Sequence, residues 1–262
     1  ELIDILDELQ DNYLLKEINE GGKVSFVFTH QKLREFVYNQ MTMSKRRILH
    51  LRIARYIKSC LNNDARDSVL YSKLIYHFEN GGDKHSALEY RIKNLEQYLQ
   101  INHEVFPVLE ETSLADKQSS CIKEKEIDNE IKNISNIISK LKQEEGQNPS
   151  LINMELSYLH LLGRSKIRNG DYESGLDIEK LISISTETEN YSMALKGYKQ
   201  IIYYCINTYN PDRMYMNIEK ALDIAYKFNI EAEIGILLRL KGMYMCMTGH
   251  FDDADTLLHQ SI

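Results

Sequence analysis

The chain has 262 residues, of which 43% are hydrophobic and 27% are charged, and its formal net charge is −7. This length can hold one large or two small domains, and the acidic balance argues against general affinity of the whole chain for nucleic acids or membranes. The four cysteines are far apart and none of them forms a CxxC pair, which argues against a disulfide framework or a zinc site. We therefore expect a reduced, cytoplasmic protein. Because the chain starts at Glu1 without Met and Ile262 falls inside a predicted helix, we also expect it to be part of a longer protein.

The first residues predict one helix followed by a β-hairpin. Apolar residues recur at intervals of three and four over residues 2–15, which is the spacing of an amphipathic helix. Over residues 14–29, Gly21 and Gly22 separate two β-prone runs, which is the pattern of a hairpin.

Two further helices are expected over about residues 31–41 and 44–60. Their spacing predicts that they bury these apolar side chains: Leu33, Phe36 and Val37 from the first, and Leu49, Ile53, Tyr56 and Ile57 from the second. The opposite side of the second helix carries the candidate basic face, formed by Arg47, Arg52, Arg55 and Lys58. A hairpin flanked by helices, one of them basic on its outer side, predicts a winged-helix module over residues 1–62.

A resemblance to a known family supports this interpretation. The matching residues are Phe28, His30, Leu33, Arg34, Glu35, Val37 and Tyr38, followed by Arg46, Arg47, Leu49, His50, Ile53 and Ala54. This stretch resembles the winged helix that follows the nucleotide-binding domain in signal-transduction ATPases with numerous domains. That family includes bacterial transcriptional activators of the streptomycete antibiotic-regulator and maltose-regulator types.

The resemblance implies a role for one histidine. In relatives, a histidine after the hairpin reaches the β-phosphate of bound ADP, and His30 occupies the matching place in this sequence. The acidic residue that follows in the family motif is replaced by Gln31. A structural role for His30, as a helix cap or a packing residue, remains the alternative.

Residues 63–262 are expected to form helical hairpins. Gly82 and Asp83 mark the turn of the first hairpin, and Ala87 is small enough for close helix packing. The segment at about 99–149 is less regular: INHEVFP breaks a helix at 101–107, and residues 112–120 are polar. A heptad-like apolar stripe from Ile127 to Leu141 then predicts a helix that packs on its neighbours.

The clearest repeat is LHLLGRSKIRNGDYESGL at 159–176, which returns as LRLKGMYMCMTGHFDDAD at 238–255. The alignment matches Gly163 with Gly242 and Gly170 with Gly249, and Tyr172 with Phe251. Gly197 lies 34 residues after Gly163, and this spacing is the tetratricopeptide period. The predicted fold is therefore all-α: a tetratricopeptide-like superhelix of helical hairpins, preceded by a small winged-helix module with one β-hairpin.

Tetratricopeptide superhelices bind ligands along a groove lined by the first helix of each hairpin. In such repeats the groove positions are the third residue before and the first after the conserved glycine. Transferred to this chain, they are His160, Arg164, Ala194, Tyr198, Arg239 and Met243, with Arg168 one turn beyond Arg164. Arginine side chains offer paired donors to oxyanions, so the groove would suit an acidic peptide, a carboxylate or a phosphorylated ligand. Solubility alone is the alternative role of these arginines.

No motif of catalysis is present: there is no phosphate loop, no GxGxxG, no HExxH and no Gly-x-Ser-x-Gly. We expect no enzyme activity, no metal and no cofactor in this region, with ATP or ADP bound by an upstream domain. Two functions remain open. One is the regulatory arm of a nucleotide-switched transcriptional activator that binds an effector, which is a peptide, a protein or a small molecule. The other is an interaction scaffold with a cyclase or kinase output. Contact with the upstream domain is expected, self-association stays open, and direct DNA or membrane binding is not expected.

Overall fold

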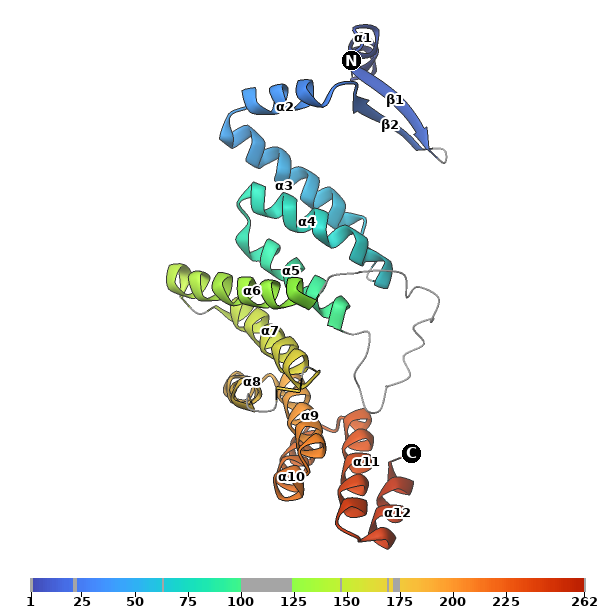
Figure 1. Ribbon diagram of the computed structural model, residues 1–262, viewed down its shortest axis with the longest axis vertical. Coiled ribbons are helices and arrows are strands. Elements are labelled where there is room, and N and C mark those ends of the chain that lie inside the picture. The colour runs from blue at the N-terminus through green and yellow to red at the C-terminus, as the bar shows by residue number, and fades with distance from the viewer. Residues whose placement is uncertain are drawn as a thin grey trace. The chain divides into compact units, whose positions relative to one another are not determined.

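The computed structural model describes residues 2–20, 23–62, 64–99, 124–146, 148–168, 170–171 and 175–261. Within these residues the chain forms twelve α-helices, one 3-10 turn and one antiparallel β-hairpin (Figure 1). They divide into two compact units, which we describe separately: residues 1–64 with 73–87, and residues 65–72 with 88–262. The predicted breaks at 101–107 and 112–120, and Tyr172, lie outside the described residues.

The first unit begins with helix α1 (Leu2–Asp11) and the hairpin of strands β1 (Leu15–Glu20) and β2 (Lys23–Phe28). Leu15 pairs with Phe28 at the open end of the hairpin. There the Thr29 hydroxyl donates a 2.6 Å hydrogen bond to the Tyr13 carbonyl. The hairpin predicted over residues 14–29 is therefore confirmed.

Helices α2 (Gln31–Gln40) and α3 (Met43–Ser59) follow, with the Thr42 side chain accepting from the Lys45 amide at the start of α3. The predicted apolar stripes are wrong in part, because Phe36 is 60% exposed and Tyr56 is 71% exposed. Val37 and Ile53 are exposed as well. The buried residues of α3 are instead His50 and Ala54. Burial on α3 depends on which side of the helix its neighbours cover. That side carries His50, whose two ring nitrogens bond to Tyr38 and His77.

Helices α4 (Ser68–Gly81) and α5 (Lys84–Leu99) form the first helical hairpin, after a 3-10 turn at Ala65–Asp67. Gly82 takes a φ of 81°, a conformation that favours glycine. Asp83 then caps α5, because its carboxylate accepts from the Ser86 amide at 2.9 Å. Ala87 is buried. The glycine turn and the small helix-packing residue predicted here are both confirmed.

In the second unit, α6 (Glu124–Glu145) packs against α7 (Pro149–Arg168). The predicted stripe of α6 is buried in one core cluster with residues of α5, α7 and α8: Ile127, Ile131, Ile134, Ile138 and Leu141. A buried carboxylate, Glu155, joins this region, because it accepts from Lys142 and from Lys180, the latter at 3.1 Å. Burial alone would raise its pKa, but the two lysines outweigh burial and lower the pKa of Glu155.

Five helices complete the second unit, and each packs against the next in the chain: α8 (Gly175–Glu187), α9 (Tyr191–Asn207), α10 (Pro211–Lys227), α11 (Glu231–Met247) and α12 (Phe251–Gln260). Their turns share one backbone design. The central residues Glu189, Tyr209, Asn229 and Gly249 have φ between 52° and 84° and lie 20 positions apart. In each turn the next amide bonds to a carbonyl five residues earlier, for example Asn210 to Cys205 at 2.9 Å. This is the Schellman arrangement that ends a helix.

Polar contacts also join helices two places apart in the chain. Gln200 of α9 donates to the backbone carbonyl of His160 in α7 at 2.8 Å. Lys199 of α9 pairs with Glu233 of α11 at 2.9 Å, and α8 and α10 are joined by Glu179 and Arg213 at 2.6 Å. Helices α7, α9 and α11, each the first helix of a hairpin, are thus neighbours, and so are α8 and α10.

Candidate functional site

The charges of Arg164 from α7 and of Lys196 and Lys199 from α9 all act on His160 of α7, and we call these four side chains the basic cluster. Burial, and after it the positive charges of Lys196, Arg164 and Lys199, together lower the pKa of His160 to about 3. Lys199 is neutralised by Glu233. Arg164 and Lys196 pair with no carboxylate among the residues that the structure describes. The cluster therefore holds a neutral histidine close to two cations that have no counterion among the described residues.

The local sequence explains why these groups meet. Gly163 follows His160 by three positions, and a Cβ built there would lie 2.7 Å from the Gln200 side-chain oxygen and 3.0 Å from Ile178. A glycine at this position lets α7 approach α8 and α9 closely. The Gln200 bond to the His160 carbonyl then fixes the register of α7 against α9.

A small cavity of about 30 Å³ adjoins His160, and it is lined by Glu96, Ser157, His160, Leu161, Met193 and Lys196. This space suffices for a water molecule. A larger ligand would therefore lie on the surface of the cluster, against Arg164 and Lys196. Glu96 sets one boundary of the cluster, because its carboxylate would repel an anion on that side.

The structure brings together only part of the predicted groove. Tyr198 and Met243 are half-buried and pack against a second core cluster, which is formed by buried residues of α8, α9, α10 and α11. Burial raises the pKa of Tyr198. Ala194 is fully buried, so the position predicted to face a ligand has no exposed surface. Arg239 is half-buried on α11. Arg168 ends α7, and its side chain lies outside the described residues.

The prediction from Gly197 fails for a geometric reason. A Cβ at Gly163 would meet Ile178 of the following helix α8, and one at Gly242 would meet Leu258 of the following helix α12. A Cβ at Gly197 would instead lie 2.7 Å from Ile182, in the preceding helix. Gly197 therefore does not correspond to the other two glycines. The groove positions counted from Gly197, which are Ala194 and Tyr198, therefore include neither Lys196 nor Lys199.

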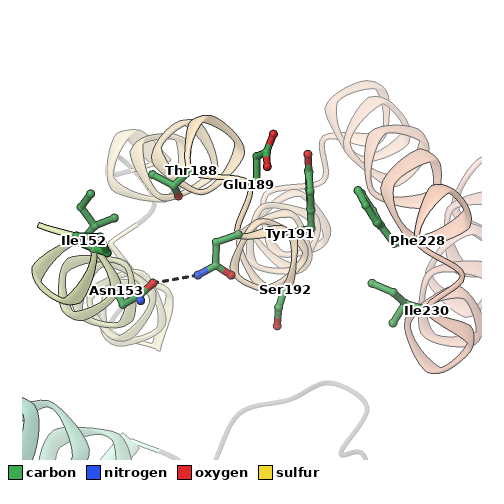
Figure 2. A pocket seen from close by; sticks show the side chains of 10 residues that line it. Ile152, Asn153, Thr188, Glu189, Tyr191, Ser192, Phe228 and Ile230 are labelled. Atoms are coloured by element: carbon green, nitrogen blue, oxygen red, sulfur yellow. Dashed lines mark hydrogen bonds between the residues drawn. The ribbon is translucent and has the colours of Figure 1, made fainter.

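A larger cavity of about 670 Å³ lies at the turns before α9 and α11 and at the start of α7. Its lining is Pro149, Ile152, Asn153, Thr188, Glu189, Asn190, Tyr191, Ser192, Phe228 and Ile230. Figure 2 shows the rings of Tyr191 and Phe228 facing each other, with Ile152 and Asn153 on the opposite wall. The two rings stack at 4.2 Å between centroids. Glu189 is the one charged side chain in this lining, so the cavity suits a neutral or cationic group and not the acidic ligand of the basic cluster.

The candidate residues of the first unit are accessible. His30 stands at the N-cap position of α2, is exposed, and makes no capping bond with its side chain. The basic-face residues Arg47, Arg52, Arg55 and Lys58 are all exposed on α3. The neighbouring Arg46, one of the residues that carry the family resemblance, makes contacts within the first unit. It donates to the carbonyls of Asn39 at 2.7 Å and Met41 at 3.1 Å, and its guanidinium lies over the Tyr38 ring.

No family model, curated protein or solved structure matches this chain. Among the described residues there is no group of three or more potential metal ligands. None of the helices that the structure describes combines the length and the apolar character needed to cross a bilayer.

Proposed function

We propose that this chain is a helical-repeat interaction region that binds an acidic partner or effector at the basic cluster of α7 and α9. The observation that carries the proposal is the pair Arg164 and Lys196, two cations on adjacent helices that have no carboxylate partner in the described residues. Arginine binds carboxylate or phosphate oxygens through two parallel hydrogen bonds, and a nearby lysine adds a point charge. The region catalyses no reaction in this proposal.

The repeat architecture belongs to the same proposal. We infer a right-handed, tetratricopeptide-like superhelix with hairpins of about 40 residues, longer than the usual repeat. Two observations support it: turns of one design recur every 20 residues from Glu189 to Gly249, and α9 is joined to α7 and to α11 by polar contacts. In a stack of this kind the first helices line one surface, which is where the basic cluster lies.

The proposed context is the regulatory part of a nucleotide-switched bacterial transcriptional regulator in the cytoplasm. Its support is the resemblance of residues 28–54 to the winged helix of that family, together with the exposure of His30 beside α2. ATP or ADP would be held by an upstream domain, and His30 would reach its phosphate. In the full-length protein, His30→Ala should weaken ADP retention, whereas Gln31→Ala should leave it unchanged. Equal retention in both variants would remove His30 from the switch.

A scaffold for a cyclase or kinase output remains the second candidate. The basic cluster serves either function equally, because it defines a ligand and not an output. The domains encoded on either side of this region in the complete gene would distinguish the two: a phosphate loop upstream supports the regulator, and a cyclase or kinase domain supports the scaffold.

Ligand binding itself can be tested directly. We expect a fluorescently labelled oligoglutamate peptide to bind the chain, with an affinity that falls as salt is added, because screening weakens exposed ion pairs. Oligolysine of the same length should not bind at the basic cluster. Absence of oligoglutamate binding at low salt would overturn the proposal.

A further inference from the structure

Three aromatic side chains form a hydrogen-bonded chain across the first unit, away from the basic cluster. The Tyr38 hydroxyl of α2 lies 2.9 Å from Nε2 of His50 in α3. On the other side of that ring, Nδ1 of His50 lies 2.9 Å from Nδ1 of His77 in α4. His50 is only 5% exposed. The two imidazoles thus connect α3 to α4 through a hydrogen bond between their Nδ1 atoms. This bond requires a proton on one of the two nitrogens and a free lone pair on the other.

Only some protonation states of the two rings preserve this hydrogen bond. With both rings neutral, one Nδ1 donates and the other accepts. With one proton added, His50 can donate from both nitrogens, to His77 and to the Tyr38 oxygen, and every bond is kept. With a second proton added, both Nδ1 atoms carry hydrogen and face each other at hydrogen-bond distance. The contact therefore accommodates one extra proton and is broken by two.

The surroundings of the pair disfavour a positive charge on either imidazole. Burial lowers the pKa of His50, and burial followed by the charge of His50 lowers the pKa of His77. The other titratable groups against the pair are Tyr38 and Tyr76, whose ring lies edge-on to His50 at 5.5 Å. The nearest cation in these contacts is Arg46, over the Tyr38 ring at 4.6 Å. No carboxylate in the described residues bonds to either imidazole.

The helices leave little room for the rings to separate. A Cβ built at Gly81, one turn after His77, would lie 2.7 Å from Leu51, which follows His50. Helices α3 and α4 are thus in close contact beside the histidine pair. Two facing N–H groups would therefore be placed at a tightly packed contact between α3 and α4.

We propose that His50 and His77 form a pH-sensitive joint that holds α3 against α4 when at most one of them is protonated and releases it when both are. The sign follows from the lowered folded-state pKa values. The joint contributes stability above the unfolded pKa of 6.5, and this contribution is lost as the pH falls below that value. The joint is independent of ligand binding at the basic cluster.

The test compares urea unfolding of the whole chain between about pH 8 and about pH 5, near the range in which histidine titrates. Wild type should lose stability on acidification, and His77→Gln should lose clearly less, because a single imidazole keeps its bonds when protonated. His30→Gln is the matched control, since His30 is exposed in the same unit, and it should behave as wild type. A second measurement needs no variant: nitrogen chemical shifts of the wild-type imidazoles should show both rings titrating below 6.5. Full acid sensitivity in His77→Gln, or ordinary titration of both rings, would refute the joint.

Discussion

The side chain of Gln200 occupies the space that a side chain at position 163 would need. Its Nε2 donates to the His160 carbonyl at 2.8 Å, and its Oε1 would lie 2.7 Å from a Cβ at Gly163. Gln200 is buried, so it has little freedom to move away. One glycine and one glutamine therefore set the distance and the register between α7 and α9, and with them the basic cluster.

Gly163→Ala should destabilise the chain by about 1–3 kcal/mol, the usual cost of overpacking a filled interior. The added methyl group must displace Gln200 or Ile178, which lies 3.0 Å away. Urea unfolding measures the change. In the double variant Gly163→Ala with Gln200→Ala, the alanine at 163 should cost less than it does alone, because the blocking side chain is gone. Strict additivity of the two changes would contradict this account.

The elements predicted from sequence are those with a local signal. The hairpin, the Gly82 turn and the apolar stripe of α6 follow from glycine pairs and apolar spacing, which neighbouring residues determine. The positions of the later helix turns could not be predicted in this way, because Glu189, Tyr209 and Asn229 take positive φ although none of them is a glycine. Without a glycine to mark these turns, the spacing between Gly163 and Gly197 suggested a period that the helices do not follow.

The sequence predicted a basic site on the first helices of the hairpins, but it identified only some of the residues that form the site. His160 and Arg164 were found because Gly163 does pack against the following helix, as the repeat pattern requires. Lys196 was not, because which face of α9 meets α7 depends on the Gln200 contact, 40 positions from its partner in sequence. The burial of His50 was hidden for a similar reason, since its partners come from two other helices.

Tyr209→Gly should stabilise the chain by about 0.5–1 kcal/mol. Tyr209 has φ of 54° and is 74% exposed, so the change relieves a left-handed conformation that costs roughly 1 kcal/mol and loses little contact. Gly249→Ala is the matched control, because Gly249 occupies the same place in another turn. It should destabilise by about 1 kcal/mol. Thermal unfolding of both variants gives the comparison, and a destabilised Tyr209→Gly would mean that its ring makes contacts that matter.

Asn210→Ala should destabilise the chain by about 1 kcal/mol, the usual cost of losing a helix cap. The Asn210 side chain accepts from the Arg213 amide at 3.1 Å at the start of α10. His250 stands at the same place before α12 and makes no side-chain cap, so His250→Ala should cost less. Chemical unfolding of the two variants tests this difference. Equal losses would show that the cap bond contributes nothing to stability.

His160 should make the chain less stable in acid. Burial first, then Lys196, Arg164 and Lys199, lower its pKa from 6.5 to about 3. The folded-state pKa is below the unfolded one, so the unfolded chain binds the extra proton between these values. The contribution is present above 6.5 and is lost as the pH falls toward about 3. His160→Gln should remove this component of the pH dependence.

Lys196→Met should raise the pKa of His160 in an imidazole titration, whereas Lys132→Met, which changes an exposed lysine of α6, should not. An unchanged value in Lys196→Met would place that charge away from the ring.

The decisive change for ligand binding is Arg164→Ala combined with Lys196→Ala. These cations lack carboxylate partners in the described residues, so their removal should leave the unfolding free energy nearly unchanged. A charge-assisted hydrogen bond contributes more to binding than a neutral one, so the affinity for oligoglutamate should fall by about tenfold or more. The salt dependence of binding should become shallower as well, because fewer ions are exchanged. The control variant Lys132→Ala with Lys140→Ala removes the same charge from exposed positions of α6 and should bind almost as wild type. If both double variants lose affinity equally, the attraction comes from the net charge of the chain and not from the cluster of α7 and α9.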